Sequence, residues 1–349
     1  MNKIKIADRE IGEDRPVFII AELSANHAGS YKIAEKSLIA IKKSGADAVK
    51  LQTYTPDTIT IDSKEKYFKI KQGTIWDGTT LYKLYKKAYM PWEWQPRLKK
   101  LADKLGLVLF SSPFDKSAVD FLEKMKVPAY KIASFEVTDI PLIRYVASRK
   151  KPVIISTGVA KMEDVKGAIE ACKEEKNEKI ILLKCTSEYP APLEEMNLLT
   201  IPDMAKKFGV FVGVSDHSDG ITVPIVSTAL GAKAIEKHFI LDKKLGGPDS
   251  KFSLDPGEFQ DMVQAVRNSE KALGKITYDL SKKSLKSREF SRSLFVVGNI
   301  KKGEVFTEEN VRSIRPGFGL SPKYLDKILG RRAKRDLKRG TPLSREHIG

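Results

Sequence analysis

Eight short apolar runs are the feature that most constrains the fold of this 349-residue chain, and an amphipathic stretch with helical spacing follows most of them. Strands that are buried on both faces read as continuous apolar runs, which is typical of a parallel sheet. Eight such units within roughly 270 residues predict a (β/α)8 barrel, the TIM-barrel fold. A doubly wound open sheet is the alternative, but it usually has fewer strands, and no GxGxxG motif follows the first run. The runs lie at 17–23, 48–54, 107–113, 129–134, 152–158, 180–187, 211–217 and 234–239.

Each of the eight runs ends in polar or charged residues. In a barrel the strand ends meet at one face, where barrel enzymes hold their active sites. A single polar residue at a strand end could be a cap or a turn former, but polar ends on all eight runs predict an active site. In chain order these residues are Glu22, Lys50, Gln52, Ser111, Ser112, Lys131, Ser134, Ser156, Thr157, Thr186, Ser187, Ser215, Asp216, His217, Glu236 and His238.

Two of the four histidines, His217 and His238, end consecutive runs. In a barrel they lie on adjacent strand ends, with Glu22 across the mouth. Nitrogen and oxygen donors of this kind suit an octahedral metal site, and Mn²⁺ or Mg²⁺ is favoured over structural zinc because no cysteine joins the set. Two alternatives stay open: one histidine acts as a general base, or both are buried structural residues.

Lysine and hydroxyl side chains at the same strand ends predict an anion site. Lys50 and Lys131, together with the serines, would form a cationic bowl rich in hydroxyl groups, and such donors bind phosphate and carboxylate. The residues alone therefore predict metal-assisted chemistry on a substrate that carries phosphate and carboxylate groups.

The net charge of +17 allows a nucleic-acid partner, an acidic membrane surface or small anionic substrates. The lysines are spread along the whole chain, and no helix-turn-helix, zinc-finger or RNP-type signature is present, so no nucleic-acid partner is expected. The N-terminus lacks a signal-peptide pattern, and no apolar run approaches the ~20 residues that span a bilayer. Cys172 and Cys185 form no CxxC motif and are interpreted as free thiols, with Cys185 a plain core residue. We expect a cytoplasmic protein without membrane contact.

The stretch 55–94 is too long for an ordinary barrel loop and contains all three tryptophans, Trp76, Trp92 and Trp94. Long loops in compact domains are usually functional or disordered. The aromatic content predicts an ordered segment that forms a lid or a wall of the site, and a satellite hydrophobic cluster is the alternative.

The sequence divides into a barrel over 1–274, a polar linker over 275–290 and a small β-rich unit over 291–349. The last unit contains an internal repeat, because "NIKKGEVFTEENV" (299–311) matches "DLKRGTPLSREHI" (336–348) nearly position for position. Threonine or serine followed by acidic residues suggests a capped helical turn in each copy.

The motifs along the chain resemble those of the sialic acid synthase family, and the C-terminal unit resembles its antifreeze-like (SAF) domain. The opening motif of sialic and legionaminic acid synthases usually reads Glu-Ile-Gly-Val-Asn-His-Asn-Gly, whereas this chain has "ELSANHAG". That variant is similar to the branch whose sugar is 2,4-diacetamido-2,4,6-trideoxy-altrose. The motifs are "IIAELSANHAGS" (19–30), "KLQTYTPD" (50–57), "FSSPFD" (110–115), "YKIAS" (130–134), "STG" (156–158), "LKCTSEYP" (183–190), "GVSDHS" (213–218), "EKHF" (236–239) and "GPDSKFSLDP" (247–256).

The resemblance implies a transferase that condenses phosphoenolpyruvate with an open-chain 2-acetamido aldose to give a nine-carbon 2-keto acid and phosphate. Three other functions stay open. The first is the same reaction on N-acetylmannosamine or on the diacetamido-mannose precursor of legionaminic acid. The second is a metal aldolase that uses pyruvate. The third is a non-catalytic module that binds nucleic acid or an acidic glycan.

The resemblance also implies a role for each matching residue. His217 and His238 match the metal-binding histidines, and Glu22 matches the glutamate beside the metal and the reacting centre. Arg315 matches an arginine that the SAF domain sends into the partner subunit's barrel to meet the acetamido group, which implies a domain-swapped homodimer. Ser112 stands where the sialic synthases have threonine, and Ser187 stands where they have asparagine beside the phosphate. Lys50, Lys131, Ser134, Ser156 and Ser215 match residues that hold phosphoenolpyruvate, and Gln52, Tyr189 and Asp249 match residues that line the substrate site.

Overall fold

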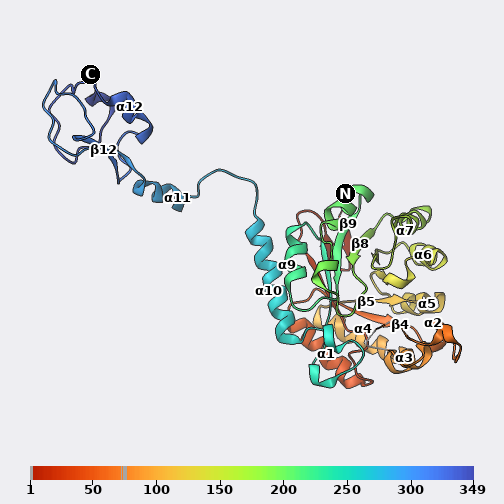
Figure 1. The fold of residues 1–349 in the computed structure, drawn as a ribbon. Coiled ribbons are helices and arrows are strands. Elements are labelled where there is room, and N and C mark those ends of the chain that lie inside the picture. The colour runs from red at the N-terminus through yellow and green to blue at the C-terminus, as the bar shows by residue number, and fades with distance from the viewer. Residues whose placement is uncertain (1–2, 72, 74–76) are drawn as a thin grey trace. The chain divides into compact units, whose positions relative to one another are not determined.

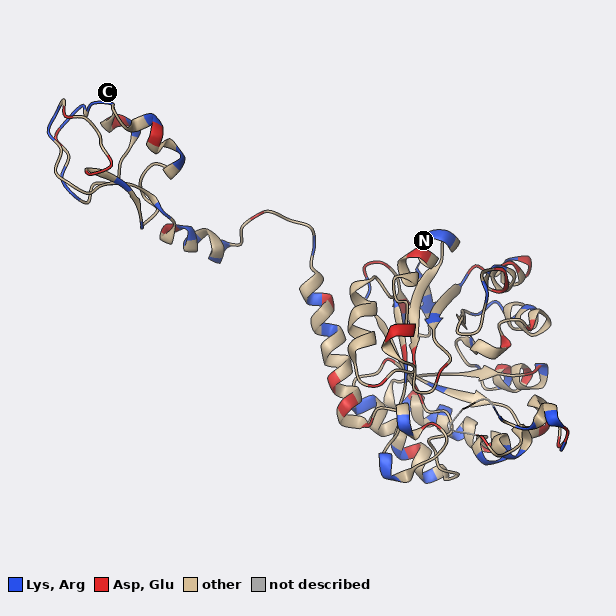
Figure 2. Ribbon diagram, viewed as in Figure 1, with Lys and Arg blue, Asp and Glu red and all other residues tan. Residues whose placement is uncertain are grey.

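The computed structural model describes residues 3–71, 73 and 77–349 (Figure 1). The chain divides into two compact units, residues 1–274 and 275–349. Basic residues occur on the helices of the first unit and throughout the second (Figure 2). In the part of the chain that the structure covers, no helix is both long and apolar enough to cross a membrane.

The first unit is a closed barrel of eight parallel strands, which confirms the predicted fold. The strands pair in chain order, and the last of them, β10, closes the barrel by pairing with the first, β3. Most strand residues are buried on both faces, which explains why the runs carry no polar alternation. The barrel strands are β3 (Phe18–Glu22), β4 (Ala48–Thr53), β5 (Val108–Pro113), β6 (Tyr130–Ile132), β7 (Val153–Ser156), β8 (Ile180–Cys185), β9 (Phe211–Asp216) and β10 (Ala234–His238).

Helices surround the barrel, and their apolar faces pack on the outward side chains of the strands. Several begin at the caps that the sequence encodes: the Asp115 carboxylate accepts from the backbone N–H groups of Ser117 and Ala118, and Asp255 forms a capping box with Glu258. The helices are α1 (Tyr31–Lys43), α4 (Gln95–Leu105), α5 (Lys116–Lys124), α6 (Ile140–Ala147), α7 (Met162–Glu174), α8 (Thr200–Phe208), α9 (Thr222–Ala229) and α10 (Pro256–Leu273), with α2 (Pro56–Ile59) and α3 (Leu81–Ala88) in the long connection after β4.

An N-terminal hairpin, which the sequence analysis did not predict, precedes the barrel. Strands β1 (Ile4–Ile6) and β2 (Arg9–Ile11) pair antiparallel. Ile4, Ile6 and Ile11 are buried in one cluster with inward-facing barrel residues such as Phe18 and Phe211. These two residues begin their strands, so the hairpin covers the end of the barrel opposite to the polar strand ends.

The second unit starts with the predicted linker, in which residues 275–290 are exposed and α11 (Lys282–Ser287) forms a short helix. Strands β11 (Ser293–Val296) and β12 (Val311–Ile314) pair antiparallel, and α12 (Leu325–Ile328) follows. A separate apolar cluster fills this unit.

The internal repeat of the second unit is also a structural repeat, and its copies pair with each other. Ile300 and Leu337, which occupy the same position in the two copies, exchange backbone hydrogen bonds of 2.9 and 2.8 Å. The repeated glycines share one backbone conformation. Gly303 and Gly340 adopt φ of +86° and +89°, in the left-handed region that favours glycine. The β-rich character of this unit is confirmed.

Candidate active site

A cavity of about 600 Å³ lies at the carboxyl ends of the barrel strands. Eleven of the fourteen predicted site residues line it, and they come from the strands or from the loops that follow them: Lys50, Gln52, Lys131, Ser134, Ser156, Ser187, Tyr189, Ser215, His217, His238 and Asp249. Glu22 and Ser112 are buried in contact with Lys50 and so belong to the same cluster. Glu22 does not lie across the mouth from the histidines as predicted, because closure of the barrel makes it the register partner of His238. Arg315 lies in the second unit, where it is exposed.

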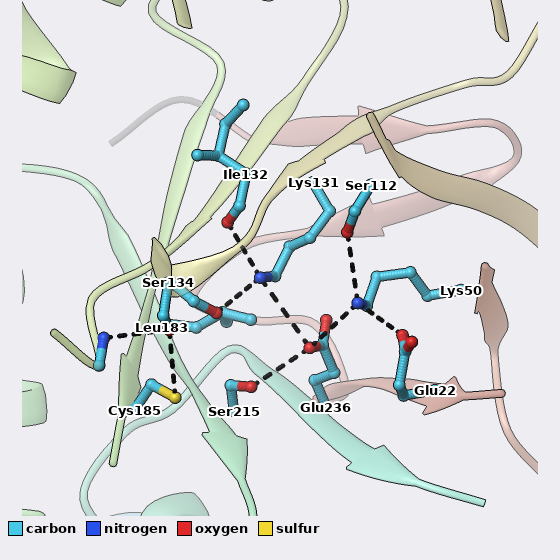
Figure 3. A network of polar contacts seen from close by, with 12 residues as sticks. Glu22, Lys50, Ser112, Lys131, Ile132, Ser134, Leu183, Cys185, Ser215 and Glu236 are labelled. Atoms are coloured by element: carbon cyan, nitrogen blue, oxygen red, sulfur yellow. Dashed lines mark hydrogen bonds and ion pairs between the residues drawn. The ribbon is translucent and has the colours of Figure 1, made fainter. Parts of the chain in front are cut away.

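Two lysines and two glutamates form a buried charge network at the base of this cavity (Figure 3). Lys50 Nζ lies 2.5 Å from Glu22 Oε2 and 3.6 Å from Glu236 Oε1. Lys131 Nζ lies 3.9 Å from the same oxygen of Glu236 and donates to Ser156 Oγ at 2.6 Å. Glu236 therefore joins the two lysines, and the predicted bowl contains two carboxylates as well as two ammonium groups.

The environment gives the two carboxylates different proton affinities. Burial raises the pKa of Glu22 to about 7, although Lys50 acts in the opposite direction. Burial would also raise the pKa of Glu236, but Lys131 and Lys50 outweigh it and hold that pKa below its usual value. Near neutral pH the network therefore exists both with and without a proton on Glu22.

His217 and His238 lie side by side, with their ring centroids 5.3 Å apart. His217 Nδ1 lies 3.0 Å from the carbonyl oxygen of Thr186. Because a carbonyl only accepts, Nδ1 carries a proton, and in the neutral imidazole the lone pair lies on Nε2. Buried His238 Nδ1 has no hydrogen-bond partner among the described residues, and both imidazoles line the cavity.

The donor set suits a metal ion that takes only part of its coordination from protein. Among the residues that the structure describes, no group of three or more His, Cys, Asp or Glu side chains could hold a metal. Two imidazoles that face an open cavity could hold a divalent ion that takes its remaining ligands from water or substrate. The orienting bond from His217 to Thr186 is also typical of metal-binding histidines.

Polar residues on β4 and on the loops after β3 and β10 extend the network toward the mouth of the cavity. Gln52 Nε2 donates to Glu22 Oε1 at 3.1 Å and to Ser24 Oγ at 3.0 Å. Ser24 in turn donates to the carboxylate of Asp249. Burial raises the pKa of Asp249 from its usual value. Ser24 lines the cavity, although the sequence analysis assigned it no role.

Three more residues of this site were not predicted as functional. Glu236 was recognised as a polar strand end, but its contacts with both lysines depend on the closure of the barrel. Glu136, two residues after Ser134, lines the cavity, and burial raises its pKa to about 7. Cys185 is buried as expected, but its Sγ lies 3.7 Å from His217 Nδ1 and 3.5 Å from Ser134 Oγ, so it is not a plain core residue.

The long connection 55–94 forms one wall of the cavity, as the sequence predicts. Its lining residues are Ile59, Tyr67, Lys69, Ile70, Leu81, Leu84, Tyr85 and Ala88. Trp92 Nε1 donates to the Tyr54 carbonyl at 3.0 Å, and the Trp94 ring packs edge-on against His27, so both tryptophans tie this wall to the barrel. Trp76 lies outside the described residues.

Comparison with known proteins agrees with this architecture. The profile of the NeuB family matches residues 38–278, and the profile of the SAF domain matches residues 291–349. The chain is 52% identical to the pseudaminic acid synthase of Campylobacter jejuni subsp. jejuni (strain 81-176), over 95% of this chain and 96% of that protein. It is 49% identical to the pseudaminic acid synthase of Helicobacter pylori (strain 26695), over 96% and 98% of the two chains.

A solved structure shares both sequence and fold with this chain. The N-acetylneuraminic acid (sialic acid) synthetase of Leptospira borgpetersenii superposes with a TM-score of 0.73 at 29% identity, covering 83% of this chain and 96% of that one. From the family profiles and the extent of identity to named synthases, the chain belongs to the NeuB family of synthases and carries a C-terminal SAF domain.

Proposed function

We propose that this protein is a pseudaminic acid synthase. The reaction condenses phosphoenolpyruvate with 2,4-diacetamido-2,4,6-trideoxy-altrose and gives a nine-carbon 2-keto sugar acid and phosphate. The observation that carries the proposal is the convergence of Lys50, Lys131 and the two histidines on one cavity. This arrangement offers cationic donors for phosphate and carboxylate beside a place for a divalent ion.

The choice of sugar rests on the relatives and on one variant position. Identities of 52% and 49% to pseudaminic acid synthases exceed the 29% to the neuraminic acid synthetase. Ser24 stands where the opening motif of sialic and legionaminic acid synthases has glycine. Its hydroxyl donates to Asp249 and accepts from Gln52, two residues expected in the substrate site. The variant motif thus changes the polar lining of the cavity itself.

Lysine and serine side chains bind phosphoenolpyruvate in the proposed reaction. Lys50 and Lys131 hold the phosphate and carboxylate of phosphoenolpyruvate, and the hydroxyls of Ser134, Ser156 and Ser215 supply further donors. The backbone at Gly158 packs directly against the Ser187 side chain, since a Cβ there would lie 2.0 Å from Ser187 Oγ. Ser187 and Ser112 therefore complete a hydroxyl-lined anion site.

Carbon–carbon bond formation joins C3 of phosphoenolpyruvate to the aldehyde carbon of the sugar. A Mn²⁺ or Mg²⁺ ion held by His217 and His238 would supply Lewis-acid chemistry at the aldehyde oxygen. The cationic C2 that results is captured by water, and Glu22 accepts a proton from that water. A carboxylate with a pKa near 7 is suited to this role near neutral pH. Phosphate then leaves by C–O cleavage, and the two lysines balance its charge.

The second unit completes the site in a homodimer. Arg315 is exposed, so its guanidinium is available to a partner. In the proposed dimer it reaches the barrel of the partner subunit and donates to the acetamido group of the sugar. The exposed linker 275–290 is compatible with an exchange of SAF domains between subunits.

Phosphate release from phosphoenolpyruvate with Mn²⁺ tests the proposal. The assay compares the diacetamido-altrose, the diacetamido-mannose and N-acetylmannosamine, each with and without chelator. Release with the altrose alone, lost on chelation, is the expected result. Release with another sugar would support the proposed reaction class but overturn the proposed specificity for the altrose. Release that chelation leaves unchanged would overturn the role of the ion, and no release with any sugar would overturn the proposed function.

A further inference from the structure

A buried ion pair joins β9, which His217 directly follows, to β10, which ends at His238. Asp216 on β9 and Lys237 on β10 are direct partners in the strand register. Lys237 Nζ lies 2.6 Å from Asp216 Oδ2, and both side chains are 0% exposed. Each of the two residues immediately precedes one of the histidines in the chain.

The same pair also fixes the turn that contains His217. Asp216 Oδ1 accepts from the backbone N–H of Ser218 at 2.8 Å and from its hydroxyl at 2.7 Å. Lys237 Nζ donates to the backbone carbonyl of Ser218 as well. The residues on either side of His217 are therefore bound to each other, and both are bound directly to Lys237 on β10.

The ion pair does not touch the cavity. Successive side chains of a strand point to opposite faces, and Ser215 and Glu236, the neighbours of the pair, line the cavity whereas Asp216 and Lys237 do not. A buried ion pair is weak evidence for stability, because desolvation of the two charges offsets their attraction. Its location between the two histidine-bearing segments points to a different role.

We propose that Asp216 and Lys237 are positioning residues that hold the His217 imidazole at a fixed place beside His238. The inference rests on the proposed function only in that the two histidines are taken to bind the divalent ion. The ion pair links β9 to β10 at the residue directly before each histidine. Without it, Ser218 loses a donor to its carbonyl, and Asp216 is left as a buried anion without its counter-ion. The turn then relaxes, and His217 moves away from the Thr186 carbonyl.

The test uses the imidazole signals of the metal-free full-length chain. The sequence has four histidines, so ¹⁵N-histidine labelling gives a small set of side-chain signals in a proton–nitrogen correlation spectrum. The expected wild-type spectrum shows His217 as the Nδ1–H tautomer. In Lys237→Met we expect the His217 and His238 signals to shift or broaden, while those of His27 and His347 stay in place. Unchanged His217 and His238 signals would overturn the proposal.

Two further variants separate positioning from general stability. Asn177→Ala is the matched control, because Asn177 is buried and donates to the carbonyls of Ala147 and Lys151. It lies before the amino end of β8, whereas the histidines lie at the carboxyl ends of β9 and β10. This variant should lower the melting temperature and leave all four histidine signals unchanged. The double variant Asp216→Asn/Lys237→Met removes both charges, so it avoids an isolated buried anion if the single variant fails to fold. It should fold and still shift His217, and its failure to fold would overturn a purely positioning role.

Mn²⁺ binding by titration calorimetry gives a second readout. Loss of an outer-shell partner typically weakens metal affinity roughly 10- to 100-fold, and we expect that range for Lys237→Met with no change for Asn177→Ala. If the wild-type chain bound no Mn²⁺ but the histidine signals moved as expected, the proposed ion would be wrong and the positioning role would stand. If Mn²⁺ bound equally to wild type and Lys237→Met, the positioning role would be wrong whatever the activity.

Discussion

The ammonium group of Lys50 lies 2.5 Å from the carboxylate of Glu22, and the side chains of both residues are at least 96% buried. The two residues are register partners on the adjacent strands β4 and β3. Lys50 also approaches Glu236 at 3.6 Å, and Ser112 accepts a hydrogen bond from it at 3.4 Å. In the proposed function, Lys50 would exchange one of these two carboxylates for the phosphate or carboxylate of phosphoenolpyruvate.

Lys50→Met should raise the KM for phosphoenolpyruvate at least about 10-fold and lower kcat, because a charge-assisted contact to a buried anion contributes roughly 1.5–3 kcal/mol. The control is Lys184→Met. Lys184 also lies on a barrel strand, but it donates to the Cys185 carbonyl and is not among the residues lining the cavity. Steady-state kinetics with phosphoenolpyruvate varied measure the effect. An unchanged KM in Lys50→Met would remove Lys50 from the anion site.

The pH dependence of kcat/KM should report the ionisation of Glu22. Burial raises its pKa to about 7, while Lys50, Glu236 and Lys131 are the charged groups that face it. A base must be deprotonated to accept a proton, so activity should rise with pH through about 7 and level off above it. Glu22→Gln should lose roughly 10²- to 10⁴-fold in kcat and also lose this limb. A limb that persists in the residual activity of Glu22→Gln would assign it to another group.

The sequence predicts the barrel because the pattern that encodes it is local. Each strand is a continuous apolar run with a polar end, so counting the runs gives both the fold and the face of the site. The same pattern does not predict the N-terminal hairpin. Its strands have three residues each, and Ile4, Ile6 and Ile11 look like scattered apolar residues until the open end of the barrel gives them a place to be buried.

The candidate site is less predictable because its chemistry depends on pairings across strands. Lys50 and Lys131 are visible at their strand ends, but only barrel closure brings Glu236 between them. For the same reason the predicted cationic bowl omits the carboxylates that balance it. Cys185 was interpreted as a core residue, since nothing in "IILLKCTS" shows that the His217 imidazole lies 3.7 Å from its sulfur.

His217→Ala should abolish divalent-ion binding and turnover together. The imidazole is one of two that line the cavity, and no group of three potential metal ligands lies among the described residues. Titration calorimetry with Mn²⁺ and the phosphate-release assay measure the two effects. His347→Ala is the control, because that histidine lies in the second unit. Phosphate release by His217→Ala in the presence of chelator would contradict the assignment.

Arg315→Ala should raise the KM for the sugar or lower kcat, with the KM for phosphoenolpyruvate nearly unchanged. The expected loss in kcat/KM is about 10- to 100-fold, which is the size of a lost charge-assisted hydrogen bond. Arg312→Ala is the matched control, since Arg312 is also exposed and lies on the adjacent strand β12. Mixing Arg315→Ala with a Lys50→Met chain adds a test of the proposed exchange. Partial recovery of activity in the mixture is expected if Arg315 acts on the partner subunit's barrel, and no recovery would argue against the exchange.

Acid should destabilise the folded barrel through His27. Its ring is 1% exposed and packs against Trp94 with a centroid distance of 5.7 Å, and its Nδ1 accepts from Gly29 N–H at 3.1 Å. Burial lowers the pKa of His27 from 6.5 to about 4, so the unfolded chain binds a proton more readily than the folded one. The contribution of neutral His27 to the free energy of unfolding is therefore fully present above pH 6.5. It is lost as the pH falls toward 4, by up to roughly 3 kcal/mol at 1.36 kcal/mol per pKa unit. His27→Gln cannot titrate. Denaturant unfolding at several pH values should show a shallower loss of stability between pH 6.5 and 4 for His27→Gln than for wild type, and identical slopes would exclude His27 as the source.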